Sequence, residues 1–199
     1  MHLITAPPRN KHQQRTDATR RALLKSARRI FARDGFEAAR LEDVAAATGH
    51  TRGAFYAHFR SKEDLFFAIF EQEAEARMRE IRAALDCCGT PAERLAALRE
   101  FFVSRIADKR WAMLMVEFKL FAVRRPSLRA RLAATHRRVR ASLKMGDIIE
   151  GQCDDLKKVA LEAVLAGFSL EHAYDPLRLP SRQAKLMLGT LFDALVHED

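Results

Sequence analysis

The chain has 199 residues, with only eight Gly and six Pro, and a net charge of +9. Few helix breakers and many Ala, Leu, Arg and Glu residues favour helices and argue against a β-sandwich, a β-barrel or a disordered chain. The longest apolar run is the six residues 111–116, far below the roughly 18 that a membrane span needs. Because the N-terminus also carries no apolar secretory segment, we expect a soluble cytoplasmic protein with no membrane partner.

The positive charge is concentrated at one end of the chain. Residues 1–60 hold 12 basic and 5 acidic side chains, so most of the net charge lies there. A basic end on a helical protein indicates a polyanionic partner, because Lys and Arg contacts to phosphate supply sequence-independent affinity. A bias toward arginine codons would explain the excess of Arg over Lys, but it would not explain this clustering.

The N-terminal segment predicts an arm followed by a helix. Residues 1–15 contain two adjacent prolines and several basic side chains with little to bury, so we predict a disordered basic arm. Thr16 and Asp17 are then plausible helix caps. Apolar residues recur after them at three- and four-residue steps until Gly35, which predicts a first amphipathic helix.

Three further helices are predicted before residue 90. A short one spans 41–48, and a second short one spans 52–59 with Thr51 as its cap. The S-x-x-D spacing that starts at Ser61 is that of a capping box, and it begins a long helix toward Leu85.

The second half of the chain predicts five more helices, which makes about nine in an all-α fold. Thr90, Pro91 and Glu93 form a strong helix start, and the segment after Trp111 is the most apolar of the chain. The predicted ranges are 90–109, 111–124, 126–149, 155–172 and 181–196.

Two short helices joined by A-T-G-H-T, after a longer helix, form a helix-turn-helix of the kind that places its second helix in the DNA major groove. Arg52 and Gly53 lie at the exposed start of that second helix. Tyr56 and Lys62 are placed to reach flanking phosphates. Double-stranded DNA is therefore the predicted partner.

The stretch G-H-T-R-G-A-F-Y-A-H-F-R-S-K-E-D-L, within a match from about Thr16 to Leu65, resembles the tetracycline-repressor (TetR) family of bacterial regulators. The resemblance implies a homodimer with a DNA-binding head at 16–65. A long fourth helix would join it to a ligand-binding and dimerisation body at 66–199. The implied function is a ligand-responsive transcriptional regulator, a repressor released from its operator by a small apolar or amphipathic effector.

Eight residues fall where this family reads bases, caps the recognition helix or touches the phosphate backbone. Arg52 is the candidate for a guanine contact. Arg40 stands where the family usually has a capping Thr, so a phosphate contact is expected there in place of the cap. For His58 the sequence leaves packing and DNA contact equally open. The eight are Arg40, Thr51, Arg52, Gly53, Ala54, Tyr56, His58 and Lys62.

The body resembles multidrug-type (AcrR-like) members coarsely, through L-M-V-E-F-K-L-F-A-V-R-R-P-S-L-R. Its aromatic and thioether side chains suffice to line an apolar cavity, although a core role is the alternative for each. Glu117 shares a helix face with apolar residues, so it needs either a basic partner such as Arg124 or Arg110 or a cationic ligand. The candidate ligand-binding residues are Phe102, Trp111, Met115, Glu117, Phe118 and Phe121.

Two apolar stripes near the C-terminus can pack inside the body or across a two-fold axis. The family favours the second arrangement, and a symmetric operator requires a dimer. The stripes comprise Leu161, Val164, Leu165 and Phe168, then Leu186, Leu188, Leu191, Phe192 and Leu195.

Other functional classes find less support in the sequence. Cys87, Cys88 and Cys153 fit no metal or disulfide spacing, so reduced thiols are favoured over a thiol or soft-metal sensor. No glycine-rich phosphate loop, H-E-x-x-H or G-x-S-x-G occurs, and we predict neither an enzyme nor a cofactor or metal site. A peptide-binding helical adaptor is the main rival, but it gives no reason for Arg52 and Lys62 at their spacing.

Overall fold

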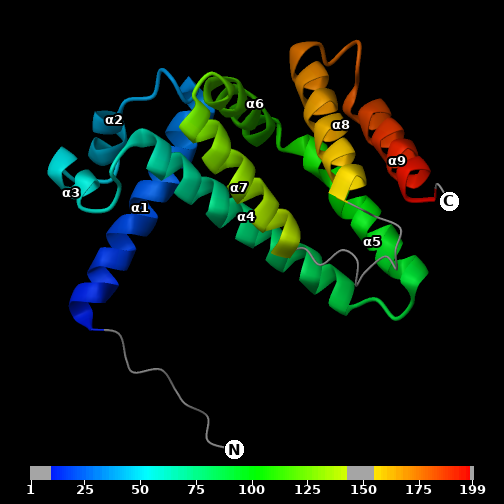
Figure 1. The fold of residues 1–199 in the computed structure, drawn as a ribbon, viewed down its shortest axis with the longest axis horizontal. Coiled ribbons are helices and arrows are strands. Elements are labelled where there is room, and N and C mark those ends of the chain that lie inside the picture. Colours follow the sequence, from blue (N-terminus) through cyan, green and yellow to red (C-terminus); the bar gives the residue numbers. More distant parts are fainter. Residues whose placement is uncertain (1–9, 143–154, 198–199) are drawn as a thin grey trace, which may run out of the picture. The chain divides into compact units, whose positions relative to one another are not determined.

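The computed structural model describes residues 10–142 and 155–197, and within these ranges the chain is all helical with no strand, which confirms the predicted fold class. It divides into two compact units, one ending at Ile69 and one beginning at Phe70, whereas the sequence pattern places the boundary after residue 65. The elements are α1 Lys11–Asp34, α2 Leu41–Ala46, α3 Arg52–Tyr56, α4 Lys62–Asp86, α5 Pro91–Ser104, the 3-10 turn η1 Arg105–Ala107, α6 Lys109–Val123, α7 Pro126–Ser142, α8 Asp155–Tyr174 and α9 Ser181–His197 (Figure 1).

Helix α1 begins at Lys11, before the predicted caps Thr16 and Asp17. Asn10 forms a capping box: its side chain accepts a hydrogen bond from His12 N (3.2 Å), and its own N–H donates to Gln13 Oε1 (3.2 Å). This box satisfies amide groups that the helix start would otherwise leave without partners. Residues 11–15 are therefore helical and do not belong to a disordered arm. Residues 1–9 of that predicted arm lie outside the described residues.

An aromatic cluster holds the first unit together. Phe31 from α1, Phe36 from the following turn and Phe66 from α4 are almost fully buried. The Phe31–Phe36 and Phe36–Phe66 ring centroids lie 5.5 and 5.6 Å apart, both in edge-to-face geometry. Such pairs add to the stabilisation that burial of each ring provides. The cluster joins α1 to the start of α4.

The turn after α2 requires a glycine. Gly49 has φ +70°, a left-handed conformation that side-chain-bearing residues rarely adopt. Its N–H donates to the carbonyl of Ala46 (3.0 Å), and the N–H of His50 donates to that of Ala45 (3.0 Å). These bonds turn the chain toward α3. Helix α2 ends at Ala46, two residues before the predicted end at 48, because the backbone already tightens into this turn.

Helix α5 starts as predicted, with both bonds of a capping box between Thr90 and Glu93. The backbone N–H groups of Gly89 and Thr90 donate to the Glu93 carboxylate and hold its pKa below the ordinary value. Because the folded-state pKa is depressed, this contribution to stability is present above the unfolded-state pKa. It is lost as the pH falls through the folded-state pKa.

Helix α5 ends at Ser104, earlier than the predicted 109. The chain then forms the 3-10 turn η1, and Asp108 leaves helical geometry with φ −87° and ψ 58°. Its side chain accepts the N–H of Trp111 (3.3 Å) and so starts a new helix, α6, at Lys109. A carboxylate acceptor at this position competes with continuation of the previous helix.

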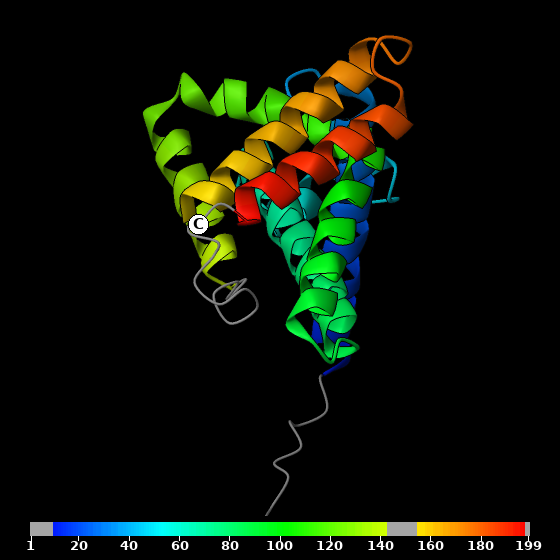
Figure 2. The ribbon, with the colours of Figure 1, turned by 90° about the vertical axis from the view of Figure 1, so that its right-hand side faces the viewer.

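Helices α8 and α9 run antiparallel and side by side in the second unit (Figures 1 and 2). Helix α9 also packs on α5, where Arg99 Nε donates to both carboxylate oxygens of Asp193 (2.8 and 2.9 Å). A Cβ at Gly189 would overlap the Arg99 guanidinium, so a larger residue there requires this flexible end of the arginine side chain to shift. The predicted end of helix α7, at about 149, lies outside the described residues. None of the described helices has the length and apolar content to cross a membrane.

We expect Thr90→Ala to lower the free energy of unfolding by about 1 kcal/mol, because it removes the side-chain acceptor of a formed capping box. The matched control is Thr16→Ala. Thr16 lies inside α1 and caps nothing, so alanine there leaves stability unchanged or slightly raised. Urea unfolding of the two variants measures both effects. A loss at Thr16 equal to that at Thr90 would contradict the observed start of α1.

Candidate functional site

The first unit presents a short helix behind a side-chain cap. Thr51 has extended backbone geometry, and its Oγ1 accepts the N–H of Ala54 (3.3 Å), which confirms the predicted cap. Helix α3 begins at Arg52 as predicted but ends at Tyr56, not at 59. Phe55 is fully buried and anchors α3 to the core of this unit. The residues at the start of α3 are consequently held at the surface on a fixed backbone.

Arg52 is exposed and bound by two neighbours. Its Nη1 lies 3.1 Å from Glu42 Oε1 on α2, and its Nη2 donates to the Tyr56 hydroxyl (3.4 Å). The guanidinium also lies over the Tyr56 ring, 5.6 Å from the centroid. The Tyr56 hydroxyl and the Glu42 carboxylate raise the pKa of Arg52. The side chain remains 63% exposed, so it is oriented and yet accessible.

The small residues of α3 leave space beside Arg52. Gly53 is exposed, and a Cβ added there would meet only the Thr51 side chain, at 3.7 Å. Ala54 is half-buried, and Tyr56 is 45% exposed on the same short helix. A surface with so few projecting atoms permits close approach of a large partner to the α3 backbone.

Arg40 and His58 have different surroundings. Arg40 occupies the cap position of α2 and makes no side-chain capping bond, as its side-chain type predicts. It is exposed and thus accessible to a phosphate. His58 is half-buried, with its ring centroid 6.4 Å from that of the buried Phe59. Packing and DNA contact both stay open for His58.

Lys62 has a structural role that the sequence did not indicate. Its Nζ donates to the carbonyls of Glu37 (2.8 Å) and Ala39 (3.1 Å), and it lies 4.9 Å from the Phe36 ring centroid. Charge-assisted bonds to backbone carbonyls are among the stronger hydrogen bonds in proteins. Lys62 therefore ties the start of α4 to the connection between α1 and α2, and its phosphate contact stays a prediction.

The second unit contains a cavity of about 260 Å³, near the lower end of the roughly 300–1,000 Å³ typical of ligand sites. Side chains from α4 to α9 line it, and most of them are apolar. Three predicted ligand residues, Phe102, Trp111 and Met115, lie in its wall. These three stay candidates for ligand contact.

The other three predicted ligand residues lie outside the cavity wall. The α6 residues that line the cavity are 111, 112, 115, 116 and 119, which with the cap residue 108 form one face of the helix. Phe118 is fully buried in the core, and Phe121 stacks on it with ring centroids 6.1 Å apart. Glu117 is half-buried on a face other than the cavity stripe. Glu117 is therefore not part of this cavity wall, and its contact with a cationic ligand stays a prediction.

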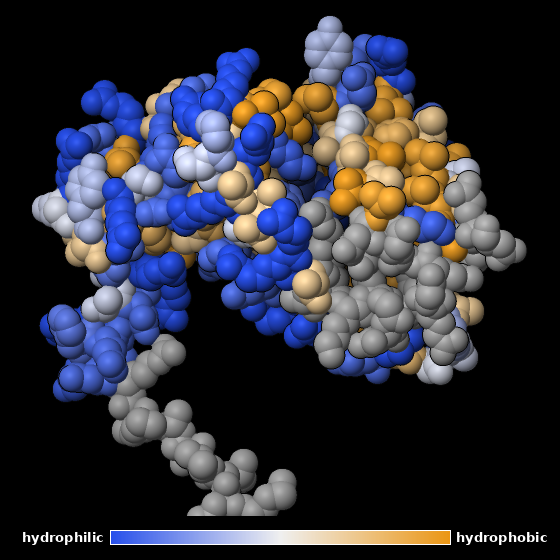
Figure 3. Space-filling view, in the orientation of Figure 1, coloured by the Kyte–Doolittle hydropathy of each residue, from blue (hydrophilic) through white to orange (hydrophobic). Residues whose placement is uncertain are grey.

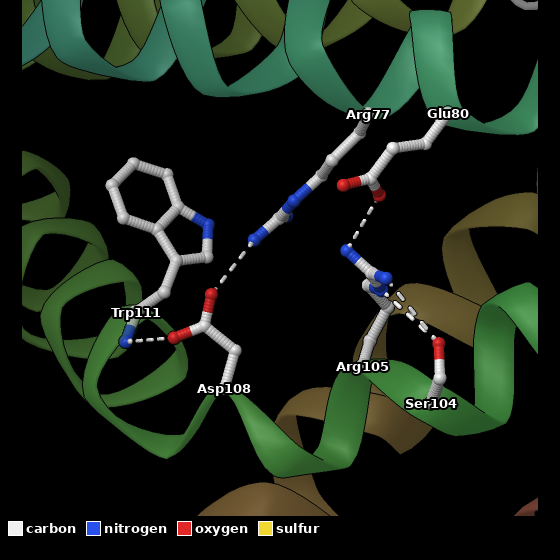
Figure 4. Close-up of polar contacts among 6 residues, drawn as sticks. All are labelled: Arg77, Glu80, Ser104, Arg105, Asp108 and Trp111. Carbon is white, nitrogen blue, oxygen red and sulfur yellow. Dashed lines mark hydrogen bonds and ion pairs between the residues drawn. The ribbon is translucent and has the colours of Figure 1, made fainter.

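Asp108 and Arg77 both line the cavity and lie beside each other (Figure 4). One carboxylate oxygen of Asp108 accepts the N–H of Trp111, and the other lies 3.8 Å from Arg77 Nη2. The Arg77 guanidinium lies over the Trp111 ring, 5.4 Å from the centroid. Helix α4 is thus joined to the start of α6 by charge and by a cation–π contact.

Arg105 makes a second connection to α4. Its Nη1 lies 3.1 Å from Glu80 Oε2, and two of its nitrogens donate to Ser104 Oγ (3.3 and 3.4 Å). The guanidinium also lies 4.7 Å from the Phe101 ring centroid. Helix α4 supplies one arginine and one glutamate, and η1 with its following cap supplies one arginine and one aspartate (Figure 4).

Further polar groups of the wall were not predicted. His136 Nδ1 lies 3.9 Å from Glu162 Oε2, and the His136 ring packs 4.8 Å from that of Phe70. Ser169 is fully buried, and its Oγ has no hydrogen-bond partner among the described residues. The amphipathic pattern of each helix indicates its buried face, but not which faces converge on one cavity.

Exposed apolar side chains gather on α8, α9 and the loop between them (Figure 3). The two C-terminal stripes contain residues buried inside the unit and residues exposed on its surface. Leu161, Leu188 and Phe192 are buried inside the unit, whereas Leu186 is 67% and Leu191 is 37% exposed. The remaining exposed members of this apolar face are Leu156, Val159, Leu170, Tyr174, Leu177 and Met187. Contiguous exposed apolar surface of this kind marks an interaction site.

The cysteines show no sensor arrangement within the described residues. Cys87 is exposed and Cys88 half-buried, and their thiols donate to the carbonyls of Ala83 and Ala84. Cys153 lies outside the described residues. The described part of the chain contains no cluster of His, Cys, Asp and Glu suited to a metal ion.

Known proteins resemble both units. A family model for bacterial regulatory proteins of the tetR family matches residues 23–69. The HTH-type transcriptional repressor Rv1474c of Mycobacterium tuberculosis is 31% identical over 166 residues, which are 81% of this chain and 87% of that protein. Two crystal structures share the fold. A transcriptional regulator from Saccharomonospora viridis in complex with choline has TM-score 0.70 and 18% identity, covering 92% of this chain and 100% of the other. The transcriptional regulator FadR from Bacillus subtilis with stearoyl-CoA has TM-score 0.65 and 15% identity, covering 89% and 97%.

We expect Lys62→Met to lower the free energy of unfolding by about 2 kcal/mol, because two carbonyl groups lose a charged donor while the apolar stem stays. Lys25→Met is the control, since Lys25 is exposed on α1. Urea unfolding followed by circular dichroism compares them. Equal stability of both variants would mean that the Lys62 bonds contribute nothing to the fold.

Proposed function

The chain belongs to the tetR family of bacterial regulatory proteins, and we propose that it is a repressor that binds its operator as a homodimer and leaves it when a small apolar or amphipathic molecule enters the body. The observation that carries the proposal is α3, capped by Thr51, anchored by Phe55 and presenting an oriented, exposed Arg52. The repressor from M. tuberculosis, similar over most of its length, supports the direction of control.

Operator recognition proceeds by exchange of partners at Arg52. In the free protein Glu42 and Tyr56 hold the guanidinium. In the major groove, guanine O6 and N7 offer it two acceptors, and such a bidentate pair contributes about 1–3 kcal/mol of discrimination. Arg40, Tyr56, His58 and Lys62 supply or support backbone contacts that set register without reading sequence. Two heads of a dimer read half-sites about 34–36 Å apart.

Release requires a ligand that prefers one state of the dimer over the other. The cavity of the second unit is the proposed ligand site, with Phe102, Trp111 and Met115 in its wall. Helix α4 supplies residues to this wall and begins within the first unit. A ligand that shifts α4 therefore acts on an element that the two units share. The choline and stearoyl-CoA complexes of structural relatives support a small-molecule site in this fold.

The apolar face of α8 and α9 is the proposed dimer interface. Its exposed leucines, with Val159 and Met187, provide the apolar surface that a stable homodimer buries. An isologous contact of this face with its own copy relates the two heads by a two-fold axis. A palindromic operator has the same symmetry.

We expect Arg52→Ala to weaken binding to the operator by about 10- to 100-fold and to leave binding to a scrambled duplex nearly unchanged. The measurement is a titration of the full chain against its own upstream DNA and a scrambled duplex at two salt concentrations. Arg60→Ala removes one exposed charge beside α3 and serves as the control, with any loss shared by both duplexes. Equal losses for Arg52→Ala on both duplexes would refute its role. Salt-sensitive binding of the unaltered chain, equal on both, would favour a basic helical adaptor.

We expect Leu186→Glu to weaken dimerisation by about 100-fold, because the two-fold axis buries two unpaired carboxylates. Leu120→Glu is the matched control, since Leu120 is 61% exposed on α6 and Leu186 is 67% exposed on α9. Sedimentation equilibrium measures the association constant of each. A Leu186→Glu variant as dimeric as the control would place the interface elsewhere.

A further inference from the structure

The cavity wall of the second unit carries more positive than negative side chains. Arg77, Arg105 and Lys119 line it together with two carboxylates, Asp108 and Glu162. The excess within the wall is one positive side chain, and in the free protein Glu80, outside the wall, balances it through its ion pair with Arg105. The polar residues of the wall bear on the charge of the occupant.

Both carboxylates of the wall are already engaged. Asp108 accepts the N–H of Trp111 and lies 3.8 Å from Arg77. Glu162 lies 3.9 Å from His136. By contrast, Lys119 has no ion-pair or hydrogen-bond partner among the described residues. A cationic ligand would have to displace these basic partners and would still face the other cations of the wall.

The two arginines approach one space from opposite sides. Arg77 projects from α4 and Arg105 from η1 (Figure 4). Their side chains are 29% and 27% exposed, so each is accessible from the cavity and partly desolvated. Glu80, the partner of Arg105, is 56% exposed and lies outside the wall. Ion pairs with such exposure contribute little, and their exchange for another anion costs little.

The rest of the wall suits an alkyl chain. Apolar side chains from α5, α6, α8 and α9 surround the remaining volume, among them Phe102, Met115, Leu161, Leu165 and Phe192. These side chains form the apolar part of the same wall that contains Arg77 and Arg105. Burial of each methylene there contributes to affinity through the hydrophobic effect.

We propose that the cavity binds a monoanionic amphiphile, with its carboxylate between Arg77 and Arg105 and its alkyl chain along the apolar wall. The carboxylate replaces Glu80 and Asp108 as partner of the two guanidinium groups, which present planar donors matched to carboxylate oxygens. The inference rests on the proposed function for its regulatory role. Binding itself is measurable without DNA.

The experiment uses Trp111, the single tryptophan of the chain and a residue of the cavity wall. Its fluorescence is followed while the full-length protein is titrated with decanoate and decyltrimethylammonium, each below its micelle concentration, and with decanol below its solubility limit. We expect decanoate to bind about tenfold more tightly than either of the others, and this preference to shrink at high salt. Equal affinities, tighter binding of the cation, or binding of none of the three would overturn the inference.

Two variants locate the anion. Arg105→Gln and Arg77→Gln are each expected to weaken decanoate binding by about tenfold and to leave decanol affinity unchanged. Unchanged decanol affinity also shows that the cavity is intact. Arg110→Gln is the control, because Arg110 is exposed on α6 and does not line the cavity. Equal losses of decanoate affinity in all three variants would mean that long-range charge, and not this site, attracts the anion.

A separate operator titration distinguishes the two proposals. Selective decanoate binding that leaves operator affinity unchanged would support the inference and count against ligand-controlled release by this class of molecule. Operator binding without any decanoate selectivity would overturn the inference while the DNA-binding part of the proposed function stands.

Discussion

The carboxylate of Asp108 determines where α6 begins, and the cavity depends on that start. By accepting the N–H of Trp111, it ends the turn that follows α5 and sets the rotation of α6. The face with Trp111, Met115 and Lys119 then turns toward the cavity, while Phe118 packs into the core. The same carboxylate contacts Arg77 on α4. One acidic side chain thus fixes both a helix start and the position of that helix against its neighbour.

The sequence predicted correctly several helix starts that depend on hydrogen bonds between residues close together in the chain. Caps at Thr51 and Thr90 act over three residues, and both are confirmed. The start of α1 was misplaced for a reason of the same kind: the Asn10 and Gln13 spacing is also a capping box, but Thr16 and Asp17 offered a competing start closer to the apolar residues. Two candidate caps within two helical turns therefore compete, and the capping box that satisfies more backbone N–H groups determines the helix start.

The sequence pattern did not predict contacts between segments that are far apart in the chain. Lys62 is predicted to contact phosphate, and nothing in the neighbouring sequence indicates that its Nζ also binds the carbonyls of Glu37 and Ala39. Three of the six predicted ligand residues, all on α6, lie outside the cavity wall. For the two phenylalanines among them the sequence could not separate core from cavity, because apolar side chains fill both. Periodicity identifies the buried face of a helix. It does not predict which charged residues line the cavity, because that depends on which helices pack together.

The contact of α5 with α9 constrains how this chain can diverge. Gly189 leaves room for the Arg99 guanidinium, which in turn binds both oxygens of Asp193. A larger residue at 189 requires the Arg99 guanidinium to shift, and that shift alters its bonds to Asp193. The effect of a larger side chain at 189 therefore depends on residues 99 and 193, so the effects of substitutions at these three positions are coupled.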